Sequence, residues 1–247
     1  MLEAKHVSKS YRHGRSTLQV LSDVSLAIAA GERVGLVGAS GAGKSTLAQI
    51  MALLMRPDAG TVSVDGRLIQ SAGLRVPAHV RRSVQLIWQS PRMSSDPRFT
   101  LRQILSEPLE SLKGPERAQA AKRLPDLLDR VGLTGELLDR QPHAVSDGQL
   151  QRACLIRALV LEPKYLICDE FTAMLDASTQ AALLNTLGDE QARTGMGIVL
   201  ITHDHSLARH WCHRIIQVAD GRLIEAEPPV ARASSSAHPA SDKAQAH

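Results

Sequence analysis

Apolar and polar residues alternate along two segments near the start of the chain, residues 2–7 and 20–29. Because successive side chains of a strand point to opposite faces of a sheet, this alternation predicts two half-buried β-strands. Residues 61–69 alternate in the same way around the dipeptide Asp65-Gly66. Asp-Gly is a favoured two-residue turn between strands, so this segment predicts a β-hairpin.

Short apolar runs and helical stretches follow each other in the rest of the chain. Residues 33–37 predict a buried strand, and residues 47–55 predict a helix that stops before Pro57. Later in the chain, the predicted strands are 165–168, 197–202 and 214–218 with a return strand in 222–227, and the predicted helix is 181–193. Strands that alternate with helices favour an α/β fold with a mostly parallel sheet.

The region of residues 90–160 loses the strand signals and gains helical ones. Helices are predicted over residues 107–112, 116–133 and 149–162. Pro125 is expected to break or kink the second of these helices, and Gly132 to end it. We therefore expect a helical subdomain inserted into the α/β core. Residues 228–247 are rich in Ala, Ser and Pro and lack apolar periodicity, so we expect a disordered tail.

The composition excludes some functions. A length of 247 residues suits one large α/β domain or two small ones, and aromatic residues make up only 2%. A nucleic-acid platform that stacks bases needs aromatic side chains on one face, so this composition argues against one. The formal charge is +4, but the basic residues are scattered and favour an ordinary solvated surface.

Cysteine usage and hydropathy bear on the cellular compartment. Cys154, Cys168 and Cys212 are too widely and irregularly spaced for a zinc site or a disulfide framework, which favours a reducing cytosol. No apolar run approaches the roughly 20 residues that span a bilayer, and the first residues lack the apolar stretch of a signal peptide. Any role at a membrane is therefore expected to come through a partner.

A Gly-rich segment that fits the pattern G-x-x-x-x-G-K-[ST] directly follows the predicted strand 33–37. Its residues are Gly38, Ala39, Ser40, Gly41, Ala42, Gly43, Lys44 and Ser45. The glycines let the backbone curl so that N–H groups point at phosphate oxygens, and the following helix adds the positive end of its dipole. Lys44 is expected to bridge the β- and γ-phosphates, Ser45 to ligate Mg²⁺, and Thr46 to begin the helix.

The predicted strand at 165–168 ends in two carboxylates, Asp169 and Glu170. In ATPases with a phosphate loop, the first carboxylate holds Mg²⁺. The second is placed to orient or deprotonate the attacking water. The phosphate loop and the paired carboxylates together predict an NTPase.

Three more motifs narrow this prediction. They are Gln89 after a strand-like segment, the segment Ser146, Asp147, Gly148 and Gln149 before a helix, and His203 after a strand. With these motifs in this order, residues 1–227 resemble the ABC transporter ATPases, with Ser146–Gln149 as their signature. The resemblance implies an α/β fold: a RecA-like P-loop ATPase core with an N-terminal antiparallel β-subdomain and an inserted α-helical subdomain.

The resemblance also implies roles for single residues. Tyr11 would stack on adenine, and Gln89 would contact Mg²⁺ or the attacking water. His203 would contact the γ-phosphate, and Asp176 would lie in the D-loop at the interface between two ATPase domains. The signature acts in trans in this family, on ATP bound to a facing subunit. The chain would therefore need a second ABC ATPase subunit, which we expect to be related but not identical.

Two motifs depart from the usual family pattern. Asp147 replaces a glycine of Leu-Ser-Gly-Gly-Gln, and Ala173-Met174 replaces Ser-Ala in the D-loop. A carboxylate near bound phosphate would repel it unless the carboxylate points away or is paired. The sequence thus suggests an asymmetric pair of ATP sites in which the site that uses Asp147 is weaker. On this hypothesis, Asp147→Gly raises the ATPase activity of the complex.

The segments around Gln89 and Glu107-Pro108-Leu109, together with Pro142-His143, resemble the dipeptide, oligopeptide and nickel importers. The absence of a long folded extension after residue 227 favours the nickel or metallophore branch. Such a chain is peripheral at the cytoplasmic face of the membrane. Its implied partners are two transmembrane permease subunits and an extracytoplasmic substrate-binding protein, without nucleic acid.

Two other classes stay open from the sequence. A soluble ABC ATPase that acts on nucleic acid or the ribosome would have tandem ATPase domains, coiled-coil insertions or a basic aromatic patch. A small-molecule kinase with a phosphate loop would leave the signature and His203 unexplained. The histidines at 203, 205, 210 and 213 are not expected to bind metal, because they do not complete a ligand set.

Overall fold

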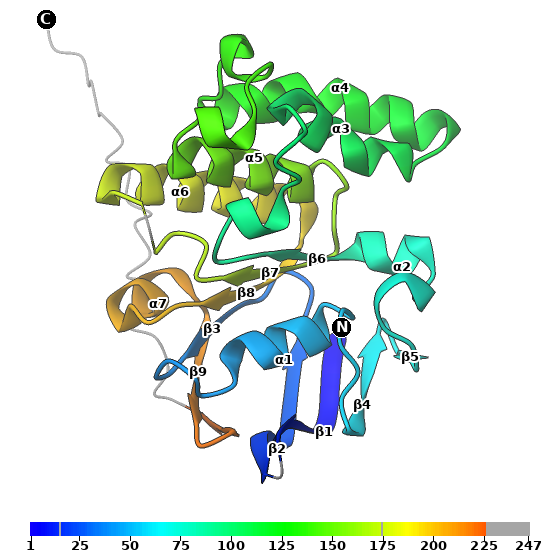
Figure 1. Cartoon of the computed structure of the whole chain (residues 1–247), viewed down its shortest axis with the longest axis vertical. Coiled ribbons are helices and arrows are strands. Elements are labelled where there is room, and N and C mark those ends of the chain that lie inside the picture. Colours follow the sequence, from blue (N-terminus) through cyan, green and yellow to red (C-terminus); the bar gives the residue numbers. More distant parts are fainter. Residues whose placement is uncertain (15, 174, 226–247) are drawn as a thin grey trace, which may run out of the picture.

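The structure is a computed structural model that describes residues 1–225 except residues 15 and 174 (Figure 1). The predicted tail at 228–247 and the predicted domain boundary at residue 227 lie outside the described residues. Two sheets and a group of helices make up the described part. The helices of residues 101–159 lie together at the top of Figure 1, and the smaller, antiparallel sheet lies at the bottom.

The larger sheet has six strands in the order β10-β9-β3-β8-β7-β6. Their bounds are β3 (Arg33–Val37), β6 (Val84–Ile87), β7 (Tyr165–Asp169), β8 (Gly197–Ile201), β9 (Arg214–Ala219) and β10 (Arg222–Glu225). Five strands are parallel, and β10 pairs antiparallel with β9. The mostly parallel sheet predicted from the sequence is therefore confirmed.

The smaller sheet is antiparallel, in the order β2-β1-β4-β5, with strands β1 (Leu2–His13), β2 (Ser16–Ile28), β4 (Ala59–Val64) and β5 (Arg67–Ile69). The predicted turn at Asp65-Gly66 is confirmed, and both residues have positive φ, 50° and 77°, as a hairpin turn of this kind requires. Strands β1 and β2 extend toward each other beyond the predicted bounds. Their extension is mostly exposed, so it carries no apolar alternation that the sequence could reveal.

Alternate residues of the central strand β7 pack against different layers. Leu166 and Cys168 belong to the apolar core that includes the helices of the upper part, whereas Tyr165 and Ile167 belong to the core shared with helix α1 (Lys44–Met51) and the antiparallel sheet. This period of two is what strand geometry imposes on a sheet that is covered on both faces. The phosphate loop, between β3 and α1, is thus held by a buried strand on one side and a buried helix on the other.

The chain between β6 and β7 contains helices and 3-10 turns but no strand, and all of its residues are described. The helices are α3 (Leu101–Glu110), α4 (Gly114–Val131) and α5 (Asp147–Leu159). Gly132 ends α4 in a left-handed conformation, as predicted. Pro125 was expected to break or kink this helix, and the break does not occur, because α4 continues through the proline. Ala120 and Leu127 on either side of it are buried, so apolar packing holds α4 together across the proline.

The remaining helices are α2 (Ala78–Ser83), α6 (Ala177–Thr194) and α7 (His205–Trp211). Helix α6 begins four residues before the predicted 181, because the side chain of Asp176 accepts a hydrogen bond from the Thr179 N–H and caps it. Helices α2 and α7 were not predicted from the sequence. Both are shorter than two full turns of apolar periodicity, so the sequence pattern carries little signal for them.

A nearly buried carboxylate links α4 to α6. The side chain of Glu190 is 3% exposed and forms ion pairs with Arg123 at 3.1 Å, Arg130 at 3.4 Å and Arg193 at 2.9 Å. Glu190 and Arg193 lie on α6, whereas Arg123 and Arg130 lie on α4. The charge of Glu190 therefore compensates guanidinium groups from both helices.

Glu190→Gln is expected to lower the free energy of unfolding by about 3 kcal/mol, because it removes the buried carboxylate that three arginines share and leaves Arg123 and Arg193 with Glu162 alone. The urea midpoint, followed by circular dichroism, measures the effect. The control is Glu116→Gln, which removes an exposed pair with Arg82 and should cost less than about 1 kcal/mol. Equal effects of the two variants would contradict the assignment of Glu190 as the link.

Candidate ATP site

The phosphate loop needs glycine at two positions. Gly38 has φ 151°, and a Cβ atom there would overlap with the carbonyl oxygen of Val218. Gly43 has φ 102°, and a Cβ atom there would lie 2.8 Å from the carbonyl oxygen of Val20. Side chains are excluded by both space and backbone conformation, so the loop keeps its tight curl between β3 and α1.

The side chain of Lys44 lies inside this loop. It is 5% exposed, and its ammonium group donates hydrogen bonds to the carbonyl oxygens of Gly38 at 2.9 Å and Ala39 at 2.8 Å. The same ammonium lies 4.0 Å from Glu170 Oε1. The expected start of the helix at Thr46 is off by two residues, because α1 already begins at Lys44.

The two carboxylates at the end of β7 have different environments. Asp169 is 4% exposed and its carboxylate accepts a hydrogen bond from the Ser45 hydroxyl. Burial raises the pKa of Asp169 and the charge of Glu170 adds to this, while the Ser45 hydrogen bond and Lys44 act in the opposite direction. Glu170 has φ 46°, an unfavourable conformation for this residue type that is typical of functional sites.

Glu170 is the point where the predicted catalytic residues meet. Gln89 Nε2 donates a hydrogen bond of 3.1 Å to Glu170 Oε2. His203 Nδ1 lies 3.8 Å from the same oxygen. Gln89 follows β6 and His203 follows β8, and these strands are the two neighbours of β7. The residues predicted separately from the sequence thus lie together at the carboxyl edge of the sheet.

A pocket joins Gln89 and Glu170 to the phosphate loop. It is lined by Val20, Ser40, Gly41, Gly43, Lys44, Ser45, Thr46, Gln89 and Glu170. Tyr11 lies beside it, because its hydroxyl is 3.5 Å from Thr46 Oγ1 and 3.3 Å from Met55 Sδ. The ring is partly exposed, at 39% for the residue, so a flat ligand has access to it.

The signature lies outside this pocket, at the start of α5. The Ser146 hydroxyl accepts from the Gln149 N–H at 3.2 Å, and the Gln149 side chain accepts from the Ser146 N–H at 2.9 Å. This reciprocal pair is a capping box, which fixes the first turn of the helix. Gly148 lies in that first turn. The side chains of Ser146 and Asp147 are exposed, so they are available to a facing molecule.

Comparison with known proteins decides the family. The sequence matches the ABC transporter family model over residues 21–173, more than half of the chain. It is 39% identical to the nickel import ATP-binding protein NikE of Rhodospirillum rubrum over 98% of this chain and 88% of that protein. The chain belongs to the ABC transporter family. As an ABC ATPase, it binds and hydrolyses ATP.

Another relative of this ABC ATPase and a solved structure lead to the same family. It is 40% identical to the probable peptide ABC transporter ATP-binding protein y4tS of Sinorhizobium fredii, over 90% of this chain but 63% of that protein. The fold matches the ATP-binding cassette MJ0796, solved as a dimer bound to ADP and Pi, with a TM-score of 0.82 and 28% identity. That match covers 94% of this chain and 100% of the other. The predicted fold class is thereby confirmed.

The sequence did not reveal how this ABC ATPase accommodates the carboxylate in its signature. Arg92, in a 3-10 turn shortly after Gln89, donates from Nε to Asp147 Oδ1 at 2.7 Å. The condition considered for Asp147, that it be paired, is therefore met within the chain. No sequence pattern could have indicated this pair, because its members are 55 residues apart and belong to different motifs.

Asp176, predicted to lie in the D-loop, bonds within its own chain. Its carboxylate accepts from the Thr179 N–H at 2.9 Å and from the Thr179 hydroxyl at 2.7 Å. These bonds hold the pKa of Asp176 below its usual value. Met174, the second residue of the unusual Ala-Met pair, lies outside the described residues. The predicted contact of Asp176 with a facing subunit stays a prediction.

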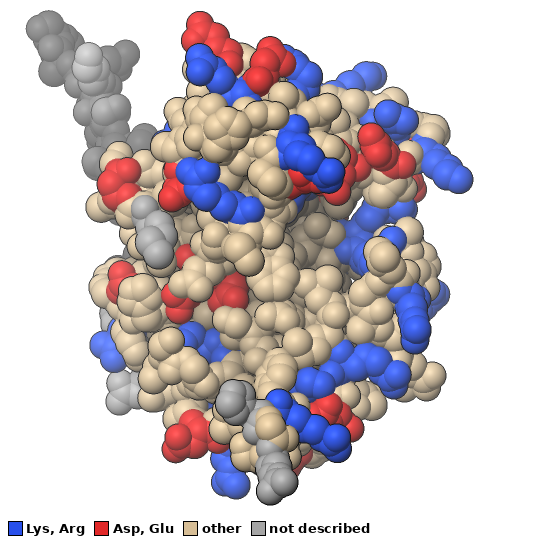
Figure 2. Space-filling view, in the orientation of Figure 1, with Lys and Arg blue, Asp and Glu red and all other residues tan. Residues whose placement is uncertain are grey.

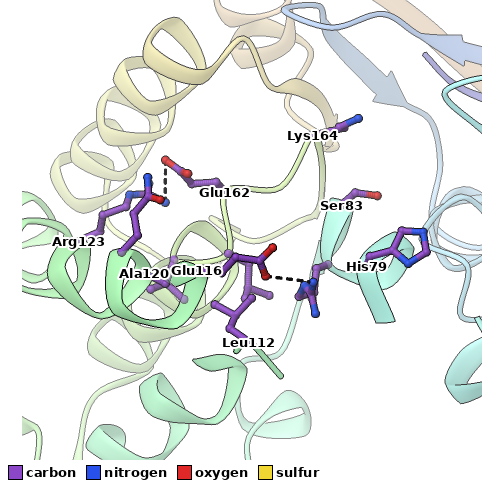
Figure 3. Close-up of a pocket in the computed structure, with 12 residues that line it drawn as sticks. His79, Ser83, Leu112, Glu116, Ala120, Arg123, Glu162 and Lys164 are labelled. Carbon is purple, nitrogen blue, oxygen red and sulfur yellow. Dashed lines mark hydrogen bonds and ion pairs between the residues drawn. The ribbon is translucent and has the colours of Figure 1, made fainter. Parts of the chain in front are cut away.

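A second pocket lies at the opposite edge of the sheet, near the amino ends of β6 and β7. Its charged side chains pair with each other: Glu116 pairs with Arg82 and, as Figure 3 shows, Glu162 pairs with Arg123. Because the phosphate loop lies at the carboxyl edge, this pocket is separate from the ATP site. Acidic and basic side chains are also mixed over the upper part of the face in Figure 2.

Neither a membrane-spanning helix nor a metal-binding cluster occurs in the part of the chain that the structure describes. No helix there is both long and apolar enough to cross a membrane. Within the same residues, no group of three or more His, Cys, Asp or Glu side chains is arranged to hold a metal ion. Each histidine of the 203–213 segment therefore lies outside any such cluster.

Proposed function

We propose that this chain is the ATP-hydrolysing motor of an ABC importer for nickel, another chelated metal or small peptides. The observation that carries the proposal is the identity with NikE, which extends over 98% of this chain. The grouping of Lys44, Gln89 and Glu170 around one pocket, with His203 beside Glu170, supports it, because an intact hydrolytic site is what a motor subunit requires.

In this proposal Lys44 binds the β- and γ-phosphates. Its ammonium is already held in the loop by two carbonyl oxygens, so it is oriented before the nucleotide arrives. The backbone N–H groups of Gly38–Thr46 and the amino end of α1 complete the phosphate site. Tyr11 stacks on adenine beside it, and its place near Thr46 supports this role.

The donor set fits Mg²⁺, which prefers oxygen ligands. Asp169 is buried and accepts a hydrogen bond from the Ser45 hydroxyl, so the two side chains present oxygen atoms at one place. Ser45, Asp169 and Gln89 would hold the ion, directly or through water. When bound, Mg²⁺ neutralises charge that develops on the phosphate oxygens.

Glu170 is the proposed general base. Gln89 orients its carboxylate, and His203 helps to position the attacking water. Gln89 donates to Glu170 Oε2, which fixes the direction of that carboxylate. His203 Nδ1 lies 3.8 Å from the same oxygen, and in this proposal its side chain contacts the γ-phosphate. Glu170 would accept the proton of the water while Lys44 holds the phosphates.

Ser146, Asp147, Gly148 and Gln149 are proposed to act in trans, on ATP bound to a second ABC ATPase subunit, and Asp176 to meet that subunit. The dimeric form of MJ0796 supports this geometry. The complete importer would add two transmembrane permease subunits and an extracytoplasmic binding protein. The chain would then lie at the cytoplasmic face of the membrane, held there by its partners.

The test is the ATPase rate of the purified chain, alone and assembled with the second ATPase and the membrane subunits. A rate that is low alone and rises on assembly supports the motor. A full rate in the isolated chain that is stimulated further by nucleic acid or ribosomes would support the soluble alternative instead. ATP-dependent uptake of nickel, measured against uptake of labelled dipeptide by the same vesicles, then decides the cargo.

A further inference from the structure

Arg92 uses its whole guanidinium group on the signature segment. Besides the bond from Nε to Asp147, it donates from Nη1 to the carbonyl oxygen of Pro142 at 2.8 Å and from Nη2 to that of Val145 at 3.3 Å. One side chain thus contacts the residues before the signature and the signature itself. A planar guanidinium suits this arrangement, because its donors have fixed directions.

The ion pair of Arg92 and Asp147 lies on the exposed surface of the signature. The side chain of Asp147 is 54% exposed and that of Arg92 is 45% exposed, so neither is shielded from a facing molecule. If the signature acts in trans as proposed above, the phosphates of a second subunit approach this surface. An unpaired carboxylate would repel them, whereas a carboxylate paired with a guanidinium presents no net charge.

We propose that Arg92 is a positioning residue that makes the Asp-containing signature competent for ATP. It cancels the charge of Asp147 and fixes the segment that leads into Ser146. The inference rests on the proposed function, since it assigns a residue to the trans half of the ATP site. The sequence suggested that the ATP site that uses Asp147 is weaker because this carboxylate repels phosphate. The pair with Arg92 removes the reason for that expectation.

The same contact connects the signature to the segment of Gln89. Gln89, Arg92 and Asp147 line one pocket together with Gln151, whose residue is 2% exposed. Gln151 Nε2 is buried and the structure gives it no hydrogen-bond partner. Arg92 is therefore one of the links between the segment after Gln89 and the start of α5.

Arg92→Gln tests the charge argument. In the assembled complex with MgATP, kcat/KM for ATP should fall about tenfold, because the Asp147 carboxylate then faces phosphate without a counter-charge. The loss should shrink as ionic strength rises, since salt screens exposed charges. In the Asp147→Asn background, Arg92→Gln should cost less than about threefold, because the repelling charge is gone.

The matched control is Arg157→Gln. Arg157 also ties α5 to the segment after Gln89, but its bond goes to the carbonyl oxygen of Ser94 at 2.7 Å. Any loss caused by Arg157→Gln should be the same in the unaltered background as in the Asp147→Asn background, because it exposes no charge on residue 147. Its dependence on ionic strength should match that of the unaltered complex.

Two results would overturn the inference. The first is that Arg92→Gln leaves kcat/KM for ATP unchanged. The second is that Arg92→Gln lowers kcat/KM as much in the Asp147→Asn background as in the unaltered one. In that case only the bonds of Arg92 to the carbonyl oxygens of Pro142 and Val145 matter. Both are read against an active unaltered complex, so they leave the motor itself standing. An unaltered complex that does not hydrolyse ATP would instead contradict the proposed function, and the inference with it.

Discussion

Glu170→Gln is expected to lower the ATPase rate of the assembled complex by at least about 100-fold, the range of a lost general base. The amide has nearly the same shape and is still able to accept the hydrogen bond from Gln89. It is neutral, however, and cannot take a proton from water. Release of phosphate at saturating MgATP measures the rate, and a fluorescent ATP analogue shows that binding survives.

The control for this variant is Glu162→Gln. Glu162 lies beside the second pocket, where it pairs with Arg123 and Arg193 far from the phosphate loop. Its replacement should leave the ATPase rate within about twofold, as expected for a partly exposed ion pair. If Glu170→Gln kept more than a tenth of the rate, another group would have to activate the water, and His203 would be examined next.

The grouping around Glu170 shows how far the sequence alone could lead. Each of Gln89, Glu170 and His203 was predicted to follow a strand, and each does. Their proximity depends on β6 and β8 being the two neighbours of β7, and strand order is not written in any local pattern. The family resemblance supplied the roles, and the sheet order brings the residues together around one carboxylate.

Other features escaped prediction because distant residues decide them. Helix α4 continues through Pro125 because residues on both sides of it pack into the core, and packing of this kind outweighs a local preference. The signature illustrates the same limit. Asp147 was expected to weaken an ATP site. The Arg92 side chain that compensates its charge lies 55 residues earlier, in the segment after Gln89, which the sequence analysis did not connect with Asp147.

The pairing of Arg92 with Asp147 therefore changes what a glycine at position 147 should do. With an unpaired carboxylate, Asp147→Gly would raise activity by removing repulsion. With the carboxylate paired, the same change leaves a lone guanidinium beside the approaching phosphates, and it also removes an acidic residue from the first turn of α5. The ATPase activity of a variant at position 147 can therefore be interpreted only when position 92 is varied as well.

Lys44→Ala is expected to weaken binding of MgATP by about 100-fold, because charge-assisted bonds to phosphate are each worth about 1.5–3 kcal/mol. It should also loosen the loop, since Lys44 bonds two of its carbonyl oxygens. Titration calorimetry measures the affinity, and circular dichroism checks that the variant is folded. Lys122→Ala, on an exposed part of α4, is the control and should bind normally. Binding by folded Lys44→Ala within about threefold of the unaltered chain would remove Lys44 from the phosphate site.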